Sequence, residues 1–119
     1  MMTKMDFAIY QSLTQRTASK REDRIHEYIY GLNGEAGELT DYLKKVYFHA
    51  HPVKRNHIKK ELGDVLWYLT RLTAELGFTL EEIAIANIAK LSERYPDGFS
   101  PDKSINRVEY NESTRREFF

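Results

Sequence analysis

The stretches that decide the fold are GLNGEAGEL at residues 31–39 and KKELGDVLWYL at residues 59–69. Each carries two acidic side chains three positions apart, Glu35 with Glu38 and Glu61 with Asp64. Residues spaced i, i+3 lie on one face of a helix, so each segment is expected to present a pair of carboxylates on one side. Four carboxylates that converge on one spot repel one another unless a cation neutralises them. The pattern therefore predicts two helices that hold a hard divalent metal ion, with Mg²⁺ as the first choice.

A helical wheel places the first acid of each pair toward the apolar side of its own helix. At about 100° per residue, Glu35 and Glu61 border the same kind of apolar sector, and Glu38 and Asp64 lie at its edge. The apolar neighbours are Tyr28, Leu32, Leu39, Leu43 and Val46 for Glu35, and Ile58, Val65, Leu69, Leu72 and Leu76 for Glu61. A carboxylate that faces inward without a partner is costly, so both acids are expected to have a ligand or a counterion.

The plainest alternative is a set of half-buried acids that pair with basic side chains. The candidate partners on the same helices are Lys45, Lys60 and Arg71. The repeated inward offset on two helices favours the metal site over this pairing. Three glycines, Gly34, Gly37 and Gly63, lie beside the acids and would admit a ligand or a crossing helix.

The overall composition excludes several classes of protein. The chain has 119 residues, 18 basic and 18 acidic side chains, and a formal net charge of zero. A binder of nucleic acid polymers or of anionic membranes usually has a basic excess. There is no cysteine, which excludes disulfides and thiol chemistry. The longest apolar run, Val65–Leu69, is too short to span a bilayer. A cytoplasmic protein with no membrane partner is the expectation.

The distribution of glycine, proline and apolar residues predicts an all-α protein. Four helices are expected near residues 4–18, 23–49, 54–76 and 80–94. Gly77 suits the end of the third helix, and Thr79 with Glu82 suits a capping box at the start of the fourth. The segment Tyr95–Phe99 is expected to turn the chain. Residues 1–99 would form a single four-helix-bundle-like domain, completed by contacts within a homo-oligomer, and residues 100–119 would form a polar C-terminal extension.

Two further groups of residues were considered as ligands. Asn87, Lys90 and Arg94 form a stripe on the fourth helix, which is either a solvated edge or a set of cations and hydrogen-bond donors for phosphates and a sugar. The histidines show no zinc-binding spacing. His57 precedes Glu61 by four residues, so it is either a surface side chain or part of the wall of the site.

With these residues in place, the chain resembles the MazG-like, all-α nucleoside triphosphate pyrophosphohydrolases. Their signature, E-E-x-x-E followed by E-x-x-D, reads Gly34-Glu35-Ala36-Gly37-Glu38 and then Glu61-Leu62-Gly63-Asp64 here. The resemblance extends over about residues 7–99 and includes N-x-x-K-x-x-x-R-Y-P-D-G-F at 87–99. One departure stands out, because Gly34 replaces the first glutamate. That replacement bears on the number of metal ions, on water activation and on substrate preference.

The resemblance implies hydrolysis of nucleoside or deoxynucleoside triphosphates to the monophosphate and pyrophosphate. It implies that Glu35, Glu38, Glu61 and Asp64 bind Mg²⁺, with Mn²⁺ as a substitute, and that Glu35 or Glu38 acts on the attacking water. The substrate-binding residues would be Asn87, Lys90 and Arg94. The protein would form a homodimer or homotetramer.

Two other functions remain open at this point. A non-catalytic helical module that binds nucleotides or a protein would account for the loss of the acid at Gly34. A di-iron carboxylate bundle would normally use Glu-x-x-His pairs, which this chain lacks.

Overall fold

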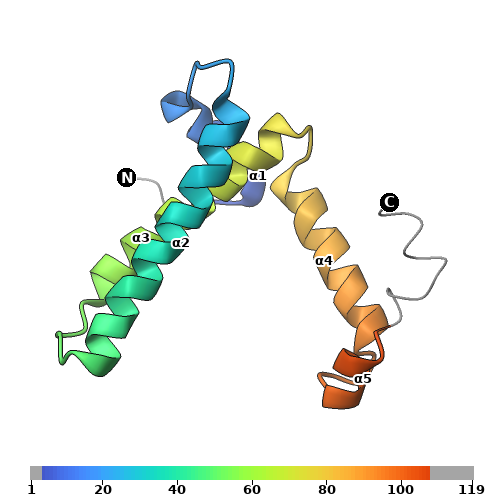
Figure 1. The fold of residues 1–119 in the computed structure, drawn as a ribbon. Helices are drawn as coiled ribbons and strands as arrows, with labels where there is room; N and C mark the ends of the chain where they lie inside the picture. Colours follow the sequence, from blue (N-terminus) through green and yellow to red (C-terminus); the bar gives the residue numbers. More distant parts are fainter. Residues whose placement is uncertain (1–3, 108–119) are drawn as a thin grey trace. The chain divides into compact units, whose positions relative to one another are not determined.

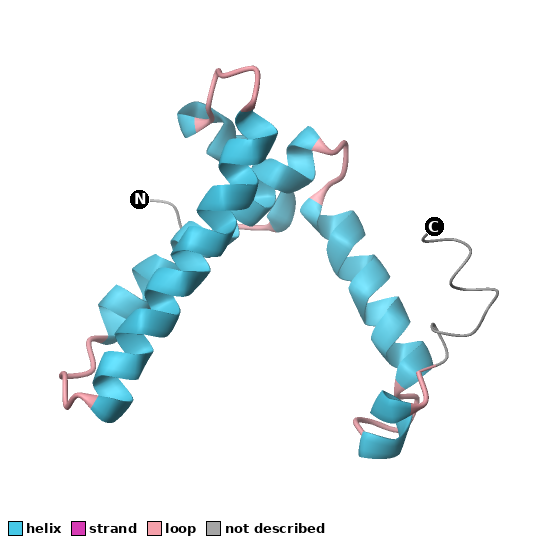
Figure 2. Cartoon of the chain, viewed as in Figure 1, coloured by secondary structure: helices cyan, strands magenta, loops and turns pink. Residues whose placement is uncertain are grey.

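The computed structural model describes residues 4–107, and within this range every regular element is a helix (Figures 1 and 2). The elements are α1 (Phe7–Thr14), a 3₁₀ helix η1 (Gln15–Thr17), α2 (Arg24–Phe48), α3 (Arg55–Glu75), α4 (Leu80–Arg94) and α5 (Pro101–Ile105). The prediction of an all-α protein is confirmed. Completion of a bundle by contacts between subunits stays a prediction. The chain divides into two compact units, with the boundary after Leu80. None of the described helices combines the length and apolar character needed to cross a membrane.

The predicted helices are found with small differences at their ends. The expected first helix, 4–18, is shorter than predicted: the α-helix starts after Asp6, whose carboxylate accepts a hydrogen bond from the Ile9 amide at 2.8 Å, and it tightens to 3₁₀ geometry after Thr14. Such tightening is common at helix ends. The short helix α5 was not predicted. Its signal is the Ser100-Pro101 pair, an N-cap followed by proline at the first helical position.

Gly77 ends α3 in the way its sequence position predicts. Its φ angle is +84°, which an L side chain adopts only at a cost. The Gly77 amide donates to the carbonyl of Ala74, and the Phe78 amide donates to that of Thr73, both at 3.0 Å. This pair of bonds is a Schellman motif, which satisfies carbonyls at the end of the helix.

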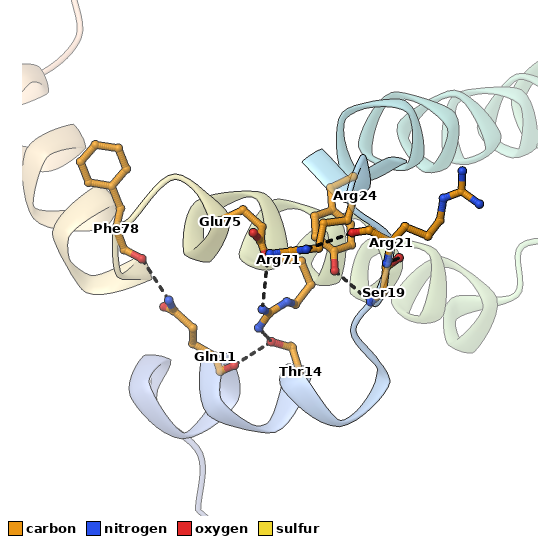
Figure 3. A network of polar contacts seen from close by, with 9 residues as sticks. Gln11, Thr14, Ser19, Arg21, Arg24, Arg71, Glu75 and Phe78 are labelled. Atoms are coloured by element: carbon orange, nitrogen blue, oxygen red, sulfur yellow. Dashed lines mark hydrogen bonds and ion pairs between the residues drawn. The ribbon is translucent and has the colours of Figure 1, made fainter. Parts of the chain in front are cut away.

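A polar network fixes α1 against α3 in the first unit (Figure 3). The buried Arg71 guanidinium donates to the hydroxyl of Thr14 at 3.1 Å, and that hydroxyl donates to the Gln11 carbonyl at 2.7 Å. The Gln11 amide group donates to the Phe78 carbonyl at 3.0 Å. Glu75 accepts a hydrogen bond from the Arg24 guanidinium at 2.8 Å, so the N-terminal end of α2 joins the same network. These contacts place α1 beside the C-terminal half of α3.

The helices α2 and α3 form a hairpin, and they run side by side in Figure 1. Tyr28 is fully buried between them, and its hydroxyl accepts a hydrogen bond from the Ser19 amide at 3.0 Å. The helices cross closely at Gly31, where an added Cβ atom would overlap the ring of Tyr68. Trp67, which lies off the apolar stripe, packs edge-on against Tyr28 and donates from its indole to Thr17 at 3.1 Å.

The loop between α2 and α3 is held by backbone contacts at its tip. Ala50 has a φ angle of +56°, and the His51 amide donates to the Lys45 carbonyl at 3.1 Å. The hydroxyl of Tyr42 donates to the Pro52 carbonyl at 3.1 Å and accepts from the Lys54 amide at 2.9 Å. One tyrosine of α2 therefore fixes the chain just before α3 begins.

Ala50→Gly is expected to stabilise the protein by about 1 kcal/mol, because the left-handed conformation strains an alanine but not a glycine. The free energy of unfolding measured by urea titration checks this. Exposed Ala36→Gly, inside α2, is the matched control and should destabilise by about the same amount. If both substitutions changed the free energy of unfolding by the same amount and in the same direction, a left-handed backbone at Ala50 would be contradicted.

Many large apolar side chains among the described residues are exposed. Of the described apolar residues, Tyr28 and Leu80 are the buried ones. On α3 and at its C-cap, the exposed set is Leu62, Leu66, Leu69 and Leu76, at 52%, 39%, 37% and 56%. These four positions fall within about 80° of one another on the helix. The helical wheel grouped Leu69 and Leu76 with the buried apolar side chains beside Glu61. This expectation is corrected, because both leucines are exposed.

Candidate metal centre

Three of the four predicted metal ligands come together between α2 and α3. Glu35, Glu38 and Glu61 each offer a carboxylate oxygen, and these oxygens all lie within 4.8 Å of one another. Two oxygens on opposite sides of an Mg²⁺ ion are separated by about 4.2 Å, twice the Mg–O distance. Small side-chain rotations would therefore bring the three groups onto one ion.

The first acid of each pair is the more buried one, as the helical wheel predicts. Glu35 is partly buried, and the side chain of Glu61 is only 15% exposed, whereas Glu38 and Asp64 are exposed. One oxygen of Glu35 and one of Glu61, Oε2 in both cases, is buried and accepts no hydrogen bond. A buried carboxylate oxygen without a donor is costly. These two oxygens fit a cation as their missing partner.

The electrostatics of the cluster act most strongly on Glu35. Its pKa is raised from the usual 4.5 to about 7, mainly by burial and further by the charges of Glu38, Asp64 and Glu61 and a hydrogen bond with Glu38. Ionising every carboxyl group of the cluster is therefore unfavourable at neutral pH in the absence of a cation. A divalent cation would reverse this effect, because it favours the ionised form.

Two of the three basic side chains that could have neutralised the acids are engaged elsewhere. Lys45 pairs with Asp41 at 2.8 Å, and Arg71 contacts Thr14 and Glu75. Within residues 4–107, no lysine or arginine forms an ion pair with any of the three clustered glutamates. The alternative in which Lys45, Lys60 or Arg71 balances the cluster is therefore wrong for the part of the chain that the structure describes.

Asp64 lies outside the group of three but close to it. Its charge contributes to the raised pKa of Glu35 and also to the raised pKa of Tyr10, for which burial is the larger cause. Tyr10 comes from α1 and was not singled out in the sequence. A modest rotation of the exposed Asp64 side chain is needed for it to join the cluster, so its role as a ligand stays a prediction.

The glycines beside the acids line open space. A Cβ atom added to Gly34, Gly37 or Gly63 would meet no atom of the described chain within 4 Å. They are therefore not positions at which α2 and α3 cross, which is the role of Gly31. The surface next to the carboxylates is free for a ligand or for a second subunit.

His57 lies at one end of the cluster. Its Nε2 atom is 3.7 Å from Oε1 of Glu61, and its ring packs edge-on against Tyr42 with 4.4 Å between ring centres. Of the two alternatives left open for His57, the surface position holds, since its side chain is 44% exposed, and the i, i+4 spacing also brings it into contact with Glu61. Tyr42 was not predicted as part of the site; its spacing of four residues after Glu38 is the signal that could have identified it.

The predicted substrate-binding residues lie on α4, in the second unit. Asn87 and Lys90 are exposed, and Arg94 is partly buried with its guanidinium 5.7 Å from the centre of the Tyr95 ring. The turn after α4 forms as predicted, with Gly98 at a φ of +92° and its amide bonded to the Tyr95 carbonyl. The role of these three residues stays a prediction.

The fold and the cluster define an all-α protein with a carboxylate centre suited to a hard divalent cation. Comparison with known families identifies it further: residues 23–99 match the MazG nucleotide pyrophosphohydrolase domain. The chain belongs to this family. It is also 35% identical over 81 residues to the Gene 37 protein of Mycobacterium phage L5, covering 65% of this chain and 71% of the phage protein. No solved structure matches the chain.

Proposed function

We propose that the protein hydrolyses nucleoside or deoxynucleoside triphosphates to the monophosphate and pyrophosphate, with Mg²⁺ as cofactor and Mn²⁺ as a substitute. One observation carries the proposal: three glutamates from two helices converge, no lysine of residues 4–107 pairs with them, and two of their oxygens are buried without a donor among the described residues. Membership of the family supports the reaction type. The proposed place of action is the cytoplasm.

Glu35, Glu38 and Glu61, with Asp64, would hold the cation against the triphosphate. When bound, Mg²⁺ supplies Lewis acidity and neutralises phosphate charge. Glu35 or Glu38 would orient the attacking water and accept its proton. Asn87, Lys90 and Arg94 would bind phosphate and sugar through charge-assisted hydrogen bonds.

A homodimer or homotetramer would complete the molecule. The exposed stripe Leu62, Leu66, Leu69 and Leu76 on α3 supports this, because monomeric proteins rarely leave such a continuous apolar face in water. Contacts on this face would also enclose the open side of the hairpin.

The expected result of incubating the protein with a panel of NTPs and dNTPs and Mg²⁺ is the monophosphate plus pyrophosphate, in equal amounts. EDTA should abolish turnover, and Mn²⁺ should restore part of it, because the ligands are all oxygen atoms. Anion-exchange chromatography of the products checks both points. Release of orthophosphate from the intact nucleotide would contradict the proposed cleavage. Tight nucleotide binding without any product would favour the non-catalytic module that Gly34 leaves open.

A further inference from the structure

A small pocket lies at the loop end of the α2–α3 hairpin. It has a volume of about 170 Å³ and is lined by Tyr42, His51, Pro52, Lys54 and His57. Its walls are fixed, because the hydroxyl of Tyr42 binds the backbone on both sides of Val53 and the His51 amide binds the Lys45 carbonyl. The pocket therefore presents one ammonium group and two imidazoles from a well-held frame.

This pocket continues the face of the carboxylate cluster. On α2, Tyr42 follows Glu38 by four residues, and on α3, His57 precedes Glu61 by four; Lys54 is the N-cap residue of α3. Residues at these spacings share one face of a helix. His57 joins the two regions directly, since it lines the pocket and has its Nε2 atom 3.7 Å from Glu61. The pocket and the cluster are thus neighbours, with His57 between them.

The charges of the pocket are opposite to those of the cluster. Within residues 4–107, Lys54 forms no ion pair, whereas Lys44 and Lys45 on the facing helix are both held by Asp41. Imidazole and ammonium groups donate N–H bonds to phosphate oxygens. A polyphosphate that extends from the metal cluster toward the loop would lie beside carboxylates. Lys54 is the cation at the loop end that would offset the negative charge of its terminal phosphates.

The size of the pocket restricts what can enter it. Its volume of about 170 Å³ is well below the 300–1,000 Å³ typical of sites for whole small molecules. A base with its sugar needs more room than this, whereas one or two phosphate groups are small enough to enter. The pocket therefore fits the far end of the substrate and not the nucleoside.

We propose that the pocket of Tyr42, His51, Lys54 and His57 binds the terminal phosphates of the triphosphate and then the pyrophosphate that is released. This inference rests on the proposed function and assigns a direction to the substrate in it. The terminal phosphates point toward the α2–α3 loop, and the nucleoside points the other way along the hairpin. Lys54 supplies the main charge, and His51 and His57 supply hydrogen bonds.

The test compares Lys54→Gln with Lys59→Gln, which removes the same charge from an exposed position about 160° around α3 from Glu61. In steady-state assays, Lys54→Gln should raise the inhibition constant of pyrophosphate about tenfold to hundredfold, because a charge-assisted hydrogen bond is lost. The inhibition constant of the nucleoside monophosphate should stay within twofold. Lys59→Gln should change neither constant, and Lys54→Arg should retain most of the pyrophosphate affinity.

Direct calorimetric titration with Mg²⁺-pyrophosphate and Mg²⁺-tripolyphosphate provides a readout that needs no turnover. Loss of this binding in Lys54→Gln alone supports the pocket even if no nucleotide is hydrolysed, and only the proposed reaction then fails. If Lys54→Gln hydrolyses nucleotides normally and binds pyrophosphate with unchanged affinity, the proposed phosphate binding by the pocket is contradicted. The proposed reaction is then unaffected. Equal weakening of pyrophosphate and monophosphate also contradicts the proposed phosphate binding, since the lysine would then not distinguish the two ends of the substrate.

Discussion

Replacing Glu35 with glutamine is expected to lower Mg²⁺-dependent turnover by about a thousandfold or more, while making the metal-free protein more stable. The loss of activity follows from the geometry, because Glu35 offers one of three oxygens that lie within 4.8 Å of one another. An amide carries no charge and cannot accept the proton of water. The charge stabilisation that a correctly held metal ion provides is worth several kcal/mol, which corresponds to this factor in rate.

The gain in stability follows from the pKa of the same carboxyl group. Burial and the neighbouring acids raise that pKa from 4.5 to about 7. The folded state therefore binds the proton more tightly than the unfolded state, and stability is lost as the pH rises from 4.5 through 7. The full difference corresponds to roughly 3.4 kcal/mol, and partial solvent access to Glu35 reduces it to about 1–2 kcal/mol. In EDTA, Glu35→Gln should be more stable than the wild type by this amount at pH 8, and equal to it at pH 4.

Urea titrations at the two pH values, together with product assays, separate the two effects. Glu22→Gln, at an exposed acid before α2, is the control and should change neither turnover nor the pH dependence. Added Mg²⁺ should stabilise the wild type more than Glu35→Gln at pH 8. Full turnover in the glutamine variant would contradict the role of Glu35 as a metal ligand. The same pH dependence of stability with and without Glu35 would contradict its raised pKa.

The sequence was sufficient to predict the pair of acidic helices because helix geometry is local. The i, i+3 spacing of the acids and their offset from the apolar sector depend only on the rotation per residue. The buried positions of Glu35 and Glu61 agree with it. The same applies to the end of α3, where Gly77 provides the positive φ angle that a Schellman motif needs.

Contacts between distant segments could not be predicted in this way. Arg71 was considered as a partner for the acids, but the structure directs it to Thr14 on α1, which is 57 residues away. Gly31 was not distinguished from the other glycines of α2, because sequence alone does not show which one faces Tyr68. Asp64 follows the same spacing as Glu38, yet it lies outside the group of three, since side-chain rotation at an exposed position is not set by the helix.

Replacing Gly31 with alanine is expected to destabilise the protein by about 1 kcal/mol net. The added Cβ atom would overlap three atoms of the Tyr68 ring. That ring cannot move freely, because it packs edge-on against Trp67 with 5.1 Å between ring centres. Overpacking of this kind costs about 1–3 kcal/mol, which exceeds the gain of about 1 kcal/mol from replacing glycine in a helix. The midpoint of thermal unfolding should fall by roughly 4 °C.

Gly34→Ala, in the same helix, is the matched control and has the opposite expected sign. No atom of the described chain lies within 4 Å of its added Cβ, so the gain in helix propensity should raise stability by about 1 kcal/mol. Thermal unfolding in EDTA, followed by circular dichroism, compares the two variants without any contribution from bound metal. Stabilisation by both substitutions would contradict the close crossing at Gly31. Destabilisation by both would mean that Gly34 is also covered, and a second subunit on the open face beside the carboxylates would then be the neighbour that the alanine meets.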